Sequence, residues 1–357
     1  MNNVSFSNRS VGDGHPCFVT FEAGPTHTGF ESAKRLITNA AQAGADAVKF
    51  QMLDADRLVA NKSQMFTYDV LLDKNSGKRE TISESLYDIF VRRSLTKNEW
   101  RLLKEHADSC NLAFFSTIGF IDEIEFLKEL GCHSIKIASA DVNHLPLIRK
   151  AARTGMCIQL DTGKSSLGEI ENAIDVIRGE GNEDIIIHHC PSGYPARLES
   201  INLKVIQTLK QLFPYPIAFS DHTPGSTMDV AAVTLGANLI EKTITEDRCT
   251  RSVEHIMSIE PDEMKAFVKE IKDLEIALGS SRRVLHQQEK ENRMAIRRSV
   301  FLAKNAKQGV KLADCCIEFR RPGFGISPDL YEILIESKLK ADLDLGHCLQ
   351  LSDLELS

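Results

Sequence analysis

The sequence predicts an eight-stranded parallel α/β barrel followed by a small β-rich module. Apolar runs along the chain repeatedly end in polar, chemically reactive residues, and a helix-like stretch follows almost every one. A parallel barrel delivers the carboxyl ends of its strands to one face in this way. After residue 279 the rhythm stops, and short segments between Gly and Pro turns indicate a separate β-rich unit.

The barrel elements follow from hydrophobic periodicity. We expect helices over residues 31–43, 98–109 and 261–278. A long insertion, residues 52–96, is predicted to be an ordered excursion with a mobile tip at residues 73–78. The expected strands cover residues 17–22, 47–51, 113–117, 134–139, 157–161, 185–189, 216–220 and 238–243.

The domain organisation is predicted from shifts in composition. Residues 1–16 lack an apolar core, so they indicate a loose N-terminal arm and not a signal peptide. The barrel is expected to occupy residues 17–280. Residues 281–298 are rich in Arg, Gln, Glu and Lys, which is typical of a solvated linker. The β-rich module then takes residues 299–357.

Composition excludes several classes of function. A chain with 26% charged residues and no apolar stretch near the roughly 18 residues of a membrane span is not a membrane protein. The net charge of −7 argues against a nucleic-acid partner, although local lysines could still bind a small anion. Nine cysteines without a CxxC spacing indicate reduced thiols in a cytoplasmic protein.

Two lysines lie within strand-like apolar runs. Lys49 stands in Ala-Val-Lys-Phe-Gln and Lys136 in Ser-Ile-Lys-Ile-Ala-Ser, where an unpaired ammonium group would be costly to bury. An anion in the barrel mouth would compensate both charges. Alternatively, each lysine pairs with an interior carboxylate such as Glu22 or Glu241. Hydroxyl groups at neighbouring strand ends could donate hydrogen bonds to a phosphate and a carboxylate together. These hydroxyl groups belong to Thr117, Ser139 and Ser220.

Other suggestive features have simpler explanations. The His-His-Cys run at residues 188–190 resembles a metal cluster, but adjacent strand residues face opposite sides, so a hydrogen-bonded core histidine is favoured. The adjacent Cys315 and Cys316 indicate packing and a surface thiol. The Gly-Phe-Gly segment at residues 323–325 follows no βα pattern, so it is not a dinucleotide loop.

Several separated motifs, in order, resemble the sialic acid synthase (N-acetylneuraminate synthase) family, and the resemblance covers about residues 17–354. It implies a (β/α)8 barrel followed by an antifreeze-like (SAF) domain, usually in a domain-swapped homodimer. The motifs are Glu22-Ala23-Gly24 with His27 and Gly29, Gly44 to Gln51, Lys136 to Ser139, Cys190 with Tyr194-Pro195, Ser220-Asp221-His222 and Arg321-Pro322-Gly323.

The resemblance also implies an activity. Members of the family condense phosphoenolpyruvate with the open-chain aldehyde of an N-acylated aminosugar such as N-acetylmannosamine, which yields a nine-carbon 2-keto acid and phosphate. Phosphoenolpyruvate is expected on Lys49, Thr117, Lys136, Ser139 and Ser220. The sugar is expected on Glu22, Gln51, Asp141, Tyr194 and Glu254, with Arg321 reaching in from a partner subunit. Catalytic roles are expected for Glu22, Lys49, Lys136 and His222, and further substrate contacts for Asp161, Ser192 and Asp221.

The expected metal site departs from the family pattern. Members hold a manganese or magnesium ion on histidines at the barrel mouth, where it polarises the aldehyde. His222 matches one of these histidines, but Thr243 stands where the second is expected. By strand parity Glu241 faces inward and could replace it; alternatively, tight metal binding has been lost. His255 is a further candidate for a sugar or metal contact.

A second departure lies at the end of the fifth strand. Asp161-Thr162-Gly163-Lys164 stands where the family has Ser-Thr-Gly-Met. The new acid and base could pair with each other, or they could change the sugar pocket so that the acceptor need not be N-acetylmannosamine. Two other functions stay open: another metal-dependent barrel aldolase or lyase, and a sugar-binding protein without a tightly bound metal.

Overall fold

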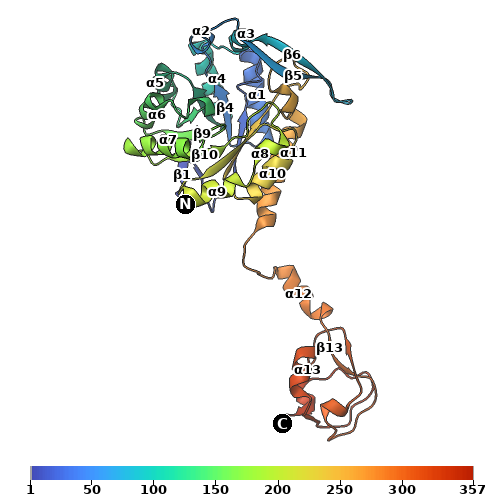
Figure 1. Cartoon of the computed structure of the whole chain (residues 1–357). Helices are drawn as coiled ribbons and strands as arrows, with labels where there is room; N and C mark the ends of the chain where they lie inside the picture. The colour runs from blue at the N-terminus through green and yellow to red at the C-terminus, as the bar shows by residue number, and fades with distance from the viewer. Residues whose placement is uncertain (1, 357) are drawn as a thin grey trace. The chain divides into compact units, whose positions relative to one another are not determined.

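Eight parallel strands close into a barrel in the computed structural model, which describes residues 2–356 (Figure 1). The chain divides into two compact units, residues 1–279 and 280–357. Each barrel strand pairs with the strands before and after it in the chain, and the last pairs with the first. The strands are β3 (Phe18–Glu22), β4 (Ala47–Gln51), β7 (Ala113–Ile118), β8 (Ser134–Ile137), β9 (Cys157–Asp161), β10 (Ile185–His189), β11 (Ile217–Asp221) and β12 (Leu239–Thr243).

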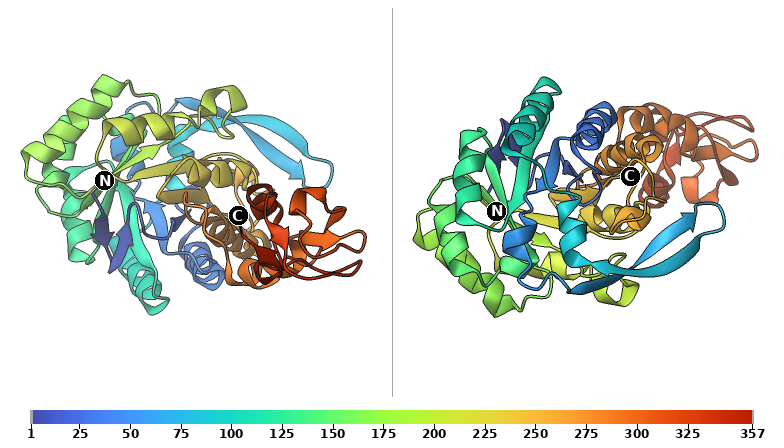
Figure 2. Two further views of the ribbon diagram at one scale, coloured as in Figure 1. Left: turned by 90° about the horizontal axis from the view of Figure 1, so that it is seen from below. Right: turned by 90° about the horizontal axis from the view of Figure 1, so that it is seen from above.

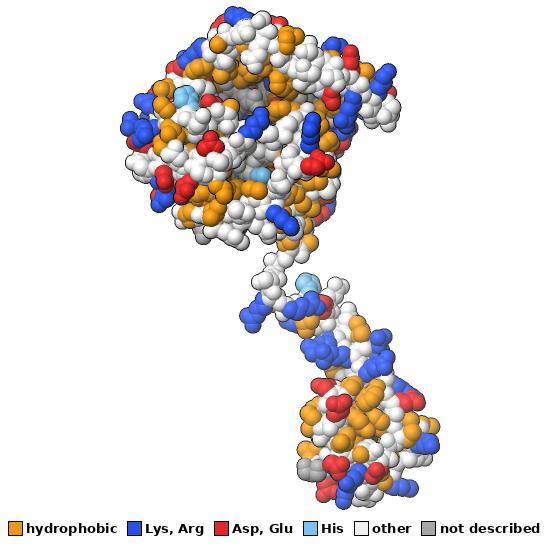
Figure 3. All heavy atoms as spheres, viewed as in Figure 1, with side chains coloured by type: hydrophobic (Ala, Val, Ile, Leu, Met, Phe, Trp, Pro, Cys, Tyr) orange, Lys and Arg blue, Asp and Glu red, His pale blue; other side chains and the backbone are white. Residues whose placement is uncertain are grey.

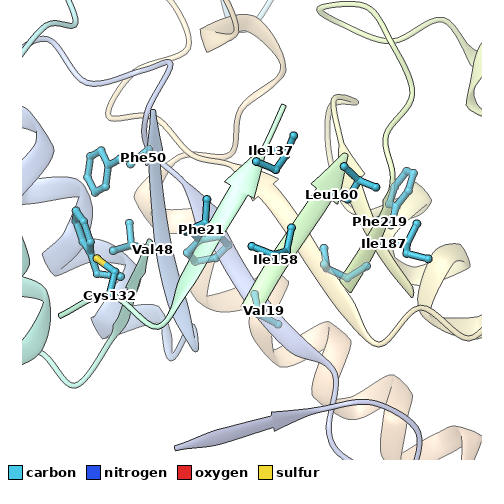
Figure 4. Packing of buried hydrophobic residues seen from close by; sticks show 14 of the residues in the cluster. Val19, Phe21, Val48, Phe50, Cys132, Ile137, Ile158, Leu160, Ile187 and Phe219 are labelled. Atoms are coloured by element: carbon cyan, nitrogen blue, oxygen red, sulfur yellow. The ribbon is translucent and has the colours of Figure 1, made fainter. Parts of the chain in front are cut away.

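Helices surround this barrel, and strand parity decides what each strand residue meets. In β3, Val19 and Phe21 point outward into the apolar layer beneath the helices (Figure 4). The alternating residues Thr20 and Glu22 therefore face the interior, where both are buried. The outer helices are α1 (Phe30–Ala43), α4 (Lys97–Ser109), α5 (Ile121–Glu129), α6 (Leu145–Ala152), α7 (Leu167–Gly179), α8 (Leu198–Ile201), α9 (Val205–Leu212), α10 (Thr227–Thr234) and α11 (Pro261–Leu278). The predicted α/β barrel is therefore confirmed.

The N-terminal residues form a hairpin at the amino-terminal end of the barrel strands. Strands β1 (Val4–Phe6) and β2 (Arg9–Val11) pair antiparallel, and Val4 and Val11 are buried in a cluster with the interior residues Phe18 and Phe115. The expected loose arm is therefore wrong for this segment. Two spaced valines are too short a pattern to predict a pair of strands. In the structure, their side chains exclude water from the barrel interior at the end opposite the polar strand ends.

The insertion between β4 and α4 is ordered, as predicted. It contains α2 (Ala55–Leu58), the antiparallel hairpin of β5 (Met65–Asp73) and β6 (Lys78–Ser85), and α3 (Leu86–Val91). The hairpin extends beyond the barrel (Figure 2). Tyr68, Ile82 and Ile89 pack with Val253 in one buried cluster, so the insertion is held against the loop that follows β12.

The second unit is small and has its own core. Helix α12 (Gln287–Ile296) lies within the predicted linker, so that segment is not irregular throughout. Strands β13 (Ser299–Leu302) and β14 (Ile317–Arg320), strands β15 (Lys338–Leu339) and β16 (Leu354–Glu355), and α13 (Pro328–Leu334) follow. Val300, Leu312 and Leu349 are among its buried residues. The fold of this unit agrees with the predicted β-rich module.

The surface of the barrel unit carries charges of both signs. Figure 3 shows Lys and Arg side chains mixed with Asp and Glu over the visible face of this unit. Within residues 2–356, no helix is both long enough and apolar enough to cross a membrane.

Candidate active site

A cavity of about 360 Å³ lies at the carboxyl ends of the barrel strands. Strand ends and the loops that follow them supply most of its polar lining, and the insertion supplies apolar side chains such as Leu86 and Phe90. This is the end at which barrel enzymes hold their active sites. The strand-end residues in the lining include Glu22, Lys49, Gln51, Thr117, Asp161 and Glu241.

The two interior lysines share one carboxylate. Lys136 Nζ lies 2.6 Å from Glu241 Oε2, and Lys49 Nζ lies 3.3 Å from Glu241 Oε1. Lys49 also pairs with Glu22, and Lys136 Nζ lies 3.0 Å from Asp161 Oδ1. Three carboxylates therefore neutralise two ammonium groups, so the alternative of lysine–carboxylate pairing is confirmed.

Polar interior residues hold Lys136 in place. Its Nζ lies 3.1 Å from Ser220 Oγ and 3.1 Å from His188 Nδ1. His188 Nε2 lies 2.9 Å from Gln159 Oε1, so both ring nitrogens have partners. His188 is thus the hydrogen-bonded core histidine that the sequence indicates. Lys136 is fully buried and, like Ser220, lies beneath the cavity lining, not in it.

Burial and charge together set the protonation of this network. Burial alone lowers the pKa of Lys49, but the carboxylates of Glu22 and Glu241 outweigh it, and the pKa is raised. Burial raises the pKa of Glu241, but Lys136 and Lys49 reverse this and hold it low. Burial raises the pKa of Glu22. Burial also lowers the pKa of His188 to about 3, so this imidazole is neutral.

The sugar-side candidates do meet at the cavity. Gln51, Asp141, Tyr194 and Glu254 line it, and the Tyr194 and His222 rings lie 4.8 Å apart between centroids. Burial raises the pKa of Glu254 to about 7, and its backbone has a φ of 75°. A non-glycine residue in the left-handed region is uncommon and recurs at functional sites. Thr117, beside Gln51 in the barrel, and Ser139, two residues before Asp141, also line the cavity.

Some predicted site residues lie elsewhere. Asp221 points away from the interior and pairs with Lys242, and its Oδ1 accepts from Thr223 Oγ1 at 2.9 Å. The assignment of Asp221 to substrate is therefore wrong in position, because adjacent residues of β11 face opposite sides. Ser192 does not line the cavity. His255 is buried against Thr245, with 2.7 Å between Nδ1 and Oγ1.

Of the two alternatives for the end of β9, the pairing of Asp161 with Lys164 is not formed. Lys164 is exposed, and Asp161 instead lies 3.0 Å from Lys136 Nζ and accepts from Ser220 Oγ at 3.0 Å. Parity explains the difference, since Asp161 is the last inward residue of the strand, whereas Lys164 lies in the following loop. Arg321 is exposed in the second unit.

The donor set around His222 does not amount to a metal site. His222 Nδ1 lies 3.0 Å from the Pro191 carbonyl, which leaves Nε2 free as one donor. Both Glu241 oxygens are engaged by lysines, which compete with a cation for them. Among the described residues, no group of three or more His, Cys, Asp or Glu side chains could hold a metal ion. The predicted pair of His222 and Glu241 is thus not supported as a complete ligand set.

Arg93 is a cavity residue that the sequence reasoning missed. It follows α3, lines the cavity and is only 4% exposed. Its neighbour Arg92 pairs with Glu84 at the surface of the insertion, so the Arg-Arg sequence alone does not show which guanidinium is buried. Only the fold of the insertion distinguishes them.

In this closed α/β barrel, buried, charged groups converge on one cavity at the strand ends. That combination defines a barrel enzyme of the type that acts on small polar molecules. A family model described as the NeuB family matches residues 36–283. The chain belongs to the NeuB family, and it is a transferase of the sugar acid synthase type.

Individual relatives are similar over most of their length. The chain is 34% identical to the N,N'-diacetyllegionaminic acid synthase of Legionella pneumophila over 95% of this chain and 97% of that protein. It is 33% identical to the N-acetylneuraminate-9-phosphate synthase of Homo sapiens, covering 76% and 74% respectively. The crystal structure of an N-acetylneuraminic acid synthetase from Leptospira borgpetersenii matches with a TM-score of 0.71 and 30% identity, over 82% of this chain and 95% of that one.

Proposed function

We propose that the protein condenses phosphoenolpyruvate with the open-chain aldehyde of an N-acylated aminosugar, giving a nine-carbon 2-keto sugar acid and phosphate. The observation that carries the proposal is the pair of buried lysines, Lys49 and Lys136, beside hydroxyl groups at the mouth of a barrel. The relatives, which are named as synthases of nine-carbon sugar acids, support the same reaction.

In this reaction carbon 3 of phosphoenolpyruvate attacks the aldehyde carbon, water adds at carbon 2, and the bond between carbon 2 and the phosphate oxygen breaks. Lys49 and Lys136 are assigned to the phosphate and carboxylate, with Thr117, Ser139 and Ser220 as hydroxyl donors. Cations fixed in advance near a leaving phosphate stabilise the charge that develops on it. Because Lys136 lies beneath the lining, Asp161 or Glu241 must move or lose charge before a ligand can touch it.

Glu254 is assigned the role of general acid. It donates the proton that the aldehyde oxygen takes up as the carbon–carbon bond forms. With a pKa of about 7 in the cavity wall, this carboxyl group holds a proton for part of the time at neutral pH, as a general acid requires. Gln51, Asp141 and Tyr194 are assigned to the sugar hydroxyl groups, and Glu22 orients Lys49. No step is assigned to a metal, because the donor set at His222 is incomplete.

The second unit is proposed to be an antifreeze-like domain that completes the site of another subunit in a homodimer. Support comes from its small β-rich core and from the exposed position of Arg321. In the dimer, the partner subunit's Arg321 would reach the acyl group of the sugar. Mixing inactive Arg321→Ala chains with inactive Lys49→Ala chains should restore part of the activity. If mixed dimers are shown to form and no activity returns, the arrangement is contradicted. A cytoplasmic location is proposed as well, since the nine cysteines are all free thiols.

The test is a reaction with phosphoenolpyruvate and a panel of N-acyl hexosamines, with manganese, magnesium or a chelator, in which phosphate release and 2-keto acid formation are followed. We expect both products with at least one acceptor and neither without an acceptor. No release with any acceptor would contradict the proposal. Saturable sugar binding in that case would favour a sugar-binding protein, which the incomplete donor set at His222 makes the second candidate.

A further inference from the structure

Arg93 is a buried cation without a charge partner in the cavity wall. Its side chain comes from the segment after α3 and lies beside apolar lining residues such as Leu86 and Phe90. Among residues 2–356 it forms no ion pair, and its side-chain hydrogen bond, from Nη2 to Ser252 Oγ, is long at 3.4 Å. A guanidinium group carries several more N–H donors, and those that reach the cavity need acceptors.

A comparison with Lys49 shows that the uncompensated charge of Arg93 is unusual. Lys49 lines the same cavity, but Glu22 and Glu241 compensate its charge. A charged group that is buried without compensation destabilises the folded protein, so such groups are rare outside binding sites. The carboxyl group with the largest influence on Arg93 is Glu254, which lies beyond ion-pair distance and has a pKa of about 7. Glu254 therefore offers only partial compensation at neutral pH.

We propose that Arg93 binds an anionic substituent, a phosphate or a carboxylate, on the acceptor sugar at the end away from its aldehyde. The planar guanidinium group fits both anions through two parallel hydrogen bonds. The aldehyde has to lie over the strand ends near Lys49, where it meets phosphoenolpyruvate, whereas Arg93 belongs to the insertion. This inference rests on the proposed function, and it narrows the acceptor to charged sugars.

The experiment compares three acceptors in the presence of phosphoenolpyruvate: N-acetylmannosamine, its 6-phosphate and the corresponding uronic acid. We expect kcat/KM to be at least tenfold higher for one charged acceptor than for the neutral one, and the preferred one identifies the anion. Arg93→Gln should abolish this preference and leave the KM for phosphoenolpyruvate unchanged. Arg93→Lys should restore part of the preference. Arg92→Gln, the same change one residue earlier at a position outside the cavity, serves as the matched control.

Binding without turnover separates this inference from the synthase proposal. Calorimetric titration of each sugar into wild-type, Arg93→Gln and Arg92→Gln proteins needs no reaction. If no acceptor releases phosphate but a charged sugar binds tenfold or more tightly to wild type than to Arg93→Gln, the synthase proposal fails and the role of Arg93 stands. The role of Arg93 would be overturned if the wild type bound charged and neutral sugars with equal affinity. It would also be overturned if Arg93→Gln lost the same factor of affinity for all three sugars.

Discussion

Lys136 Nζ lies 2.6 Å from Glu241 Oε2, and the other oxygen of the same carboxylate lies 3.3 Å from Lys49 Nζ. Glu241 therefore holds two buried ammonium groups together that would otherwise repel each other. An incoming phosphate would take over part of this role. The charge of Glu241 thus couples the stability of the empty barrel to its affinity for anions.

Replacing Glu241 by Gln should lower the free energy of unfolding by about 3–5 kcal/mol, the range for removing one partner of a buried ion pair. Added inorganic phosphate or phosphoenolpyruvate should stabilise the variant more than the wild type. Urea unfolding with and without each anion measures both effects. The matched control is Glu180→Gln, which removes a carboxylate paired with the more exposed Arg149 and Arg153 and should lower the stability far less than Glu241→Gln. Equal stabilisation of Glu241→Gln and wild type by phosphate would contradict the coupling.

Asp161 contacts Lys136 and Ser220, two of the groups to which the proposed function assigns the ligand anion. Its Oδ1 lies 3.0 Å from Lys136 Nζ and accepts from Ser220 Oγ. Replacing Asp161 by Ser should lower the KM for phosphoenolpyruvate roughly tenfold, which corresponds to about 1.4 kcal/mol. Steady-state kinetics at saturating acceptor measures this change. Asp161→Asn keeps the shape without the charge and should give a similar decrease. An unchanged or higher KM in both variants would show that Asp161 does not compete with the substrate.

Strand parity made much of the site predictable. Lys49, Glu241 and Ser220 were placed in the interior because side chains alternate along a strand and polar residues in apolar runs stand out. The motif Ser220-Asp221-His222 predicts Asp221 at the substrate only if its residues act together. Because Ser220 faces the interior, its neighbour Asp221 faces the other side of β11. The alternation does not decide between the two alternatives for Lys164, because that residue lies in a loop, and loop conformation does not follow strand parity.

The remaining features depend on contacts between distant segments. The burial of Arg93 follows from the packing of the insertion against the loop after β12, which places Ile89 beside Val253. The hairpin of β1 and β2 depends on the open end of the barrel, into which Val4 and Val11 fit. Neither relationship leaves a periodic pattern in the local sequence.

Asp221 is predicted to support the fold and not the reaction. It forms a buried network with Lys242, whose Nζ also lies 3.1 Å from Asp229 Oδ2. Asp221→Asn should therefore lower the free energy of unfolding by about 3 kcal/mol. The KM values for both substrates should stay within about twofold of wild type. Ser220→Ala, one residue earlier on the inward face, should instead raise the KM for phosphoenolpyruvate. A KM increase in Asp221→Asn as large as that in Ser220→Ala would contradict the assignment.

Glu254 should make both stability and activity depend on pH near neutrality. Burial raises its pKa from the ordinary 4.5 to about 7. Between these values the folded protein keeps a proton that the unfolded chain has lost, so this group makes folding less favourable as pH rises. This loss of folding stability is complete once the pH exceeds the pKa of Glu254 in the folded protein. It amounts to about 3 kcal/mol, at 1.36 kcal/mol per pKa unit.

Urea unfolding of wild type and Glu254→Gln from pH 5 to pH 8 measures this dependence. The stability of wild type relative to Glu254→Gln should fall by about 2.5 kcal/mol across that range, since part of the loss already occurs below pH 5 and the amide does not ionise. Glu31→Gln, the same change at an exposed position of α1, is the matched control. If Glu254 also supplies the proton, kcat with a saturating acceptor should decline above about pH 7 as the carboxyl group ionises. A flat difference in stability between pH 5 and pH 8 would show that Glu254 is ionised throughout, and the proton would then have to come from another group.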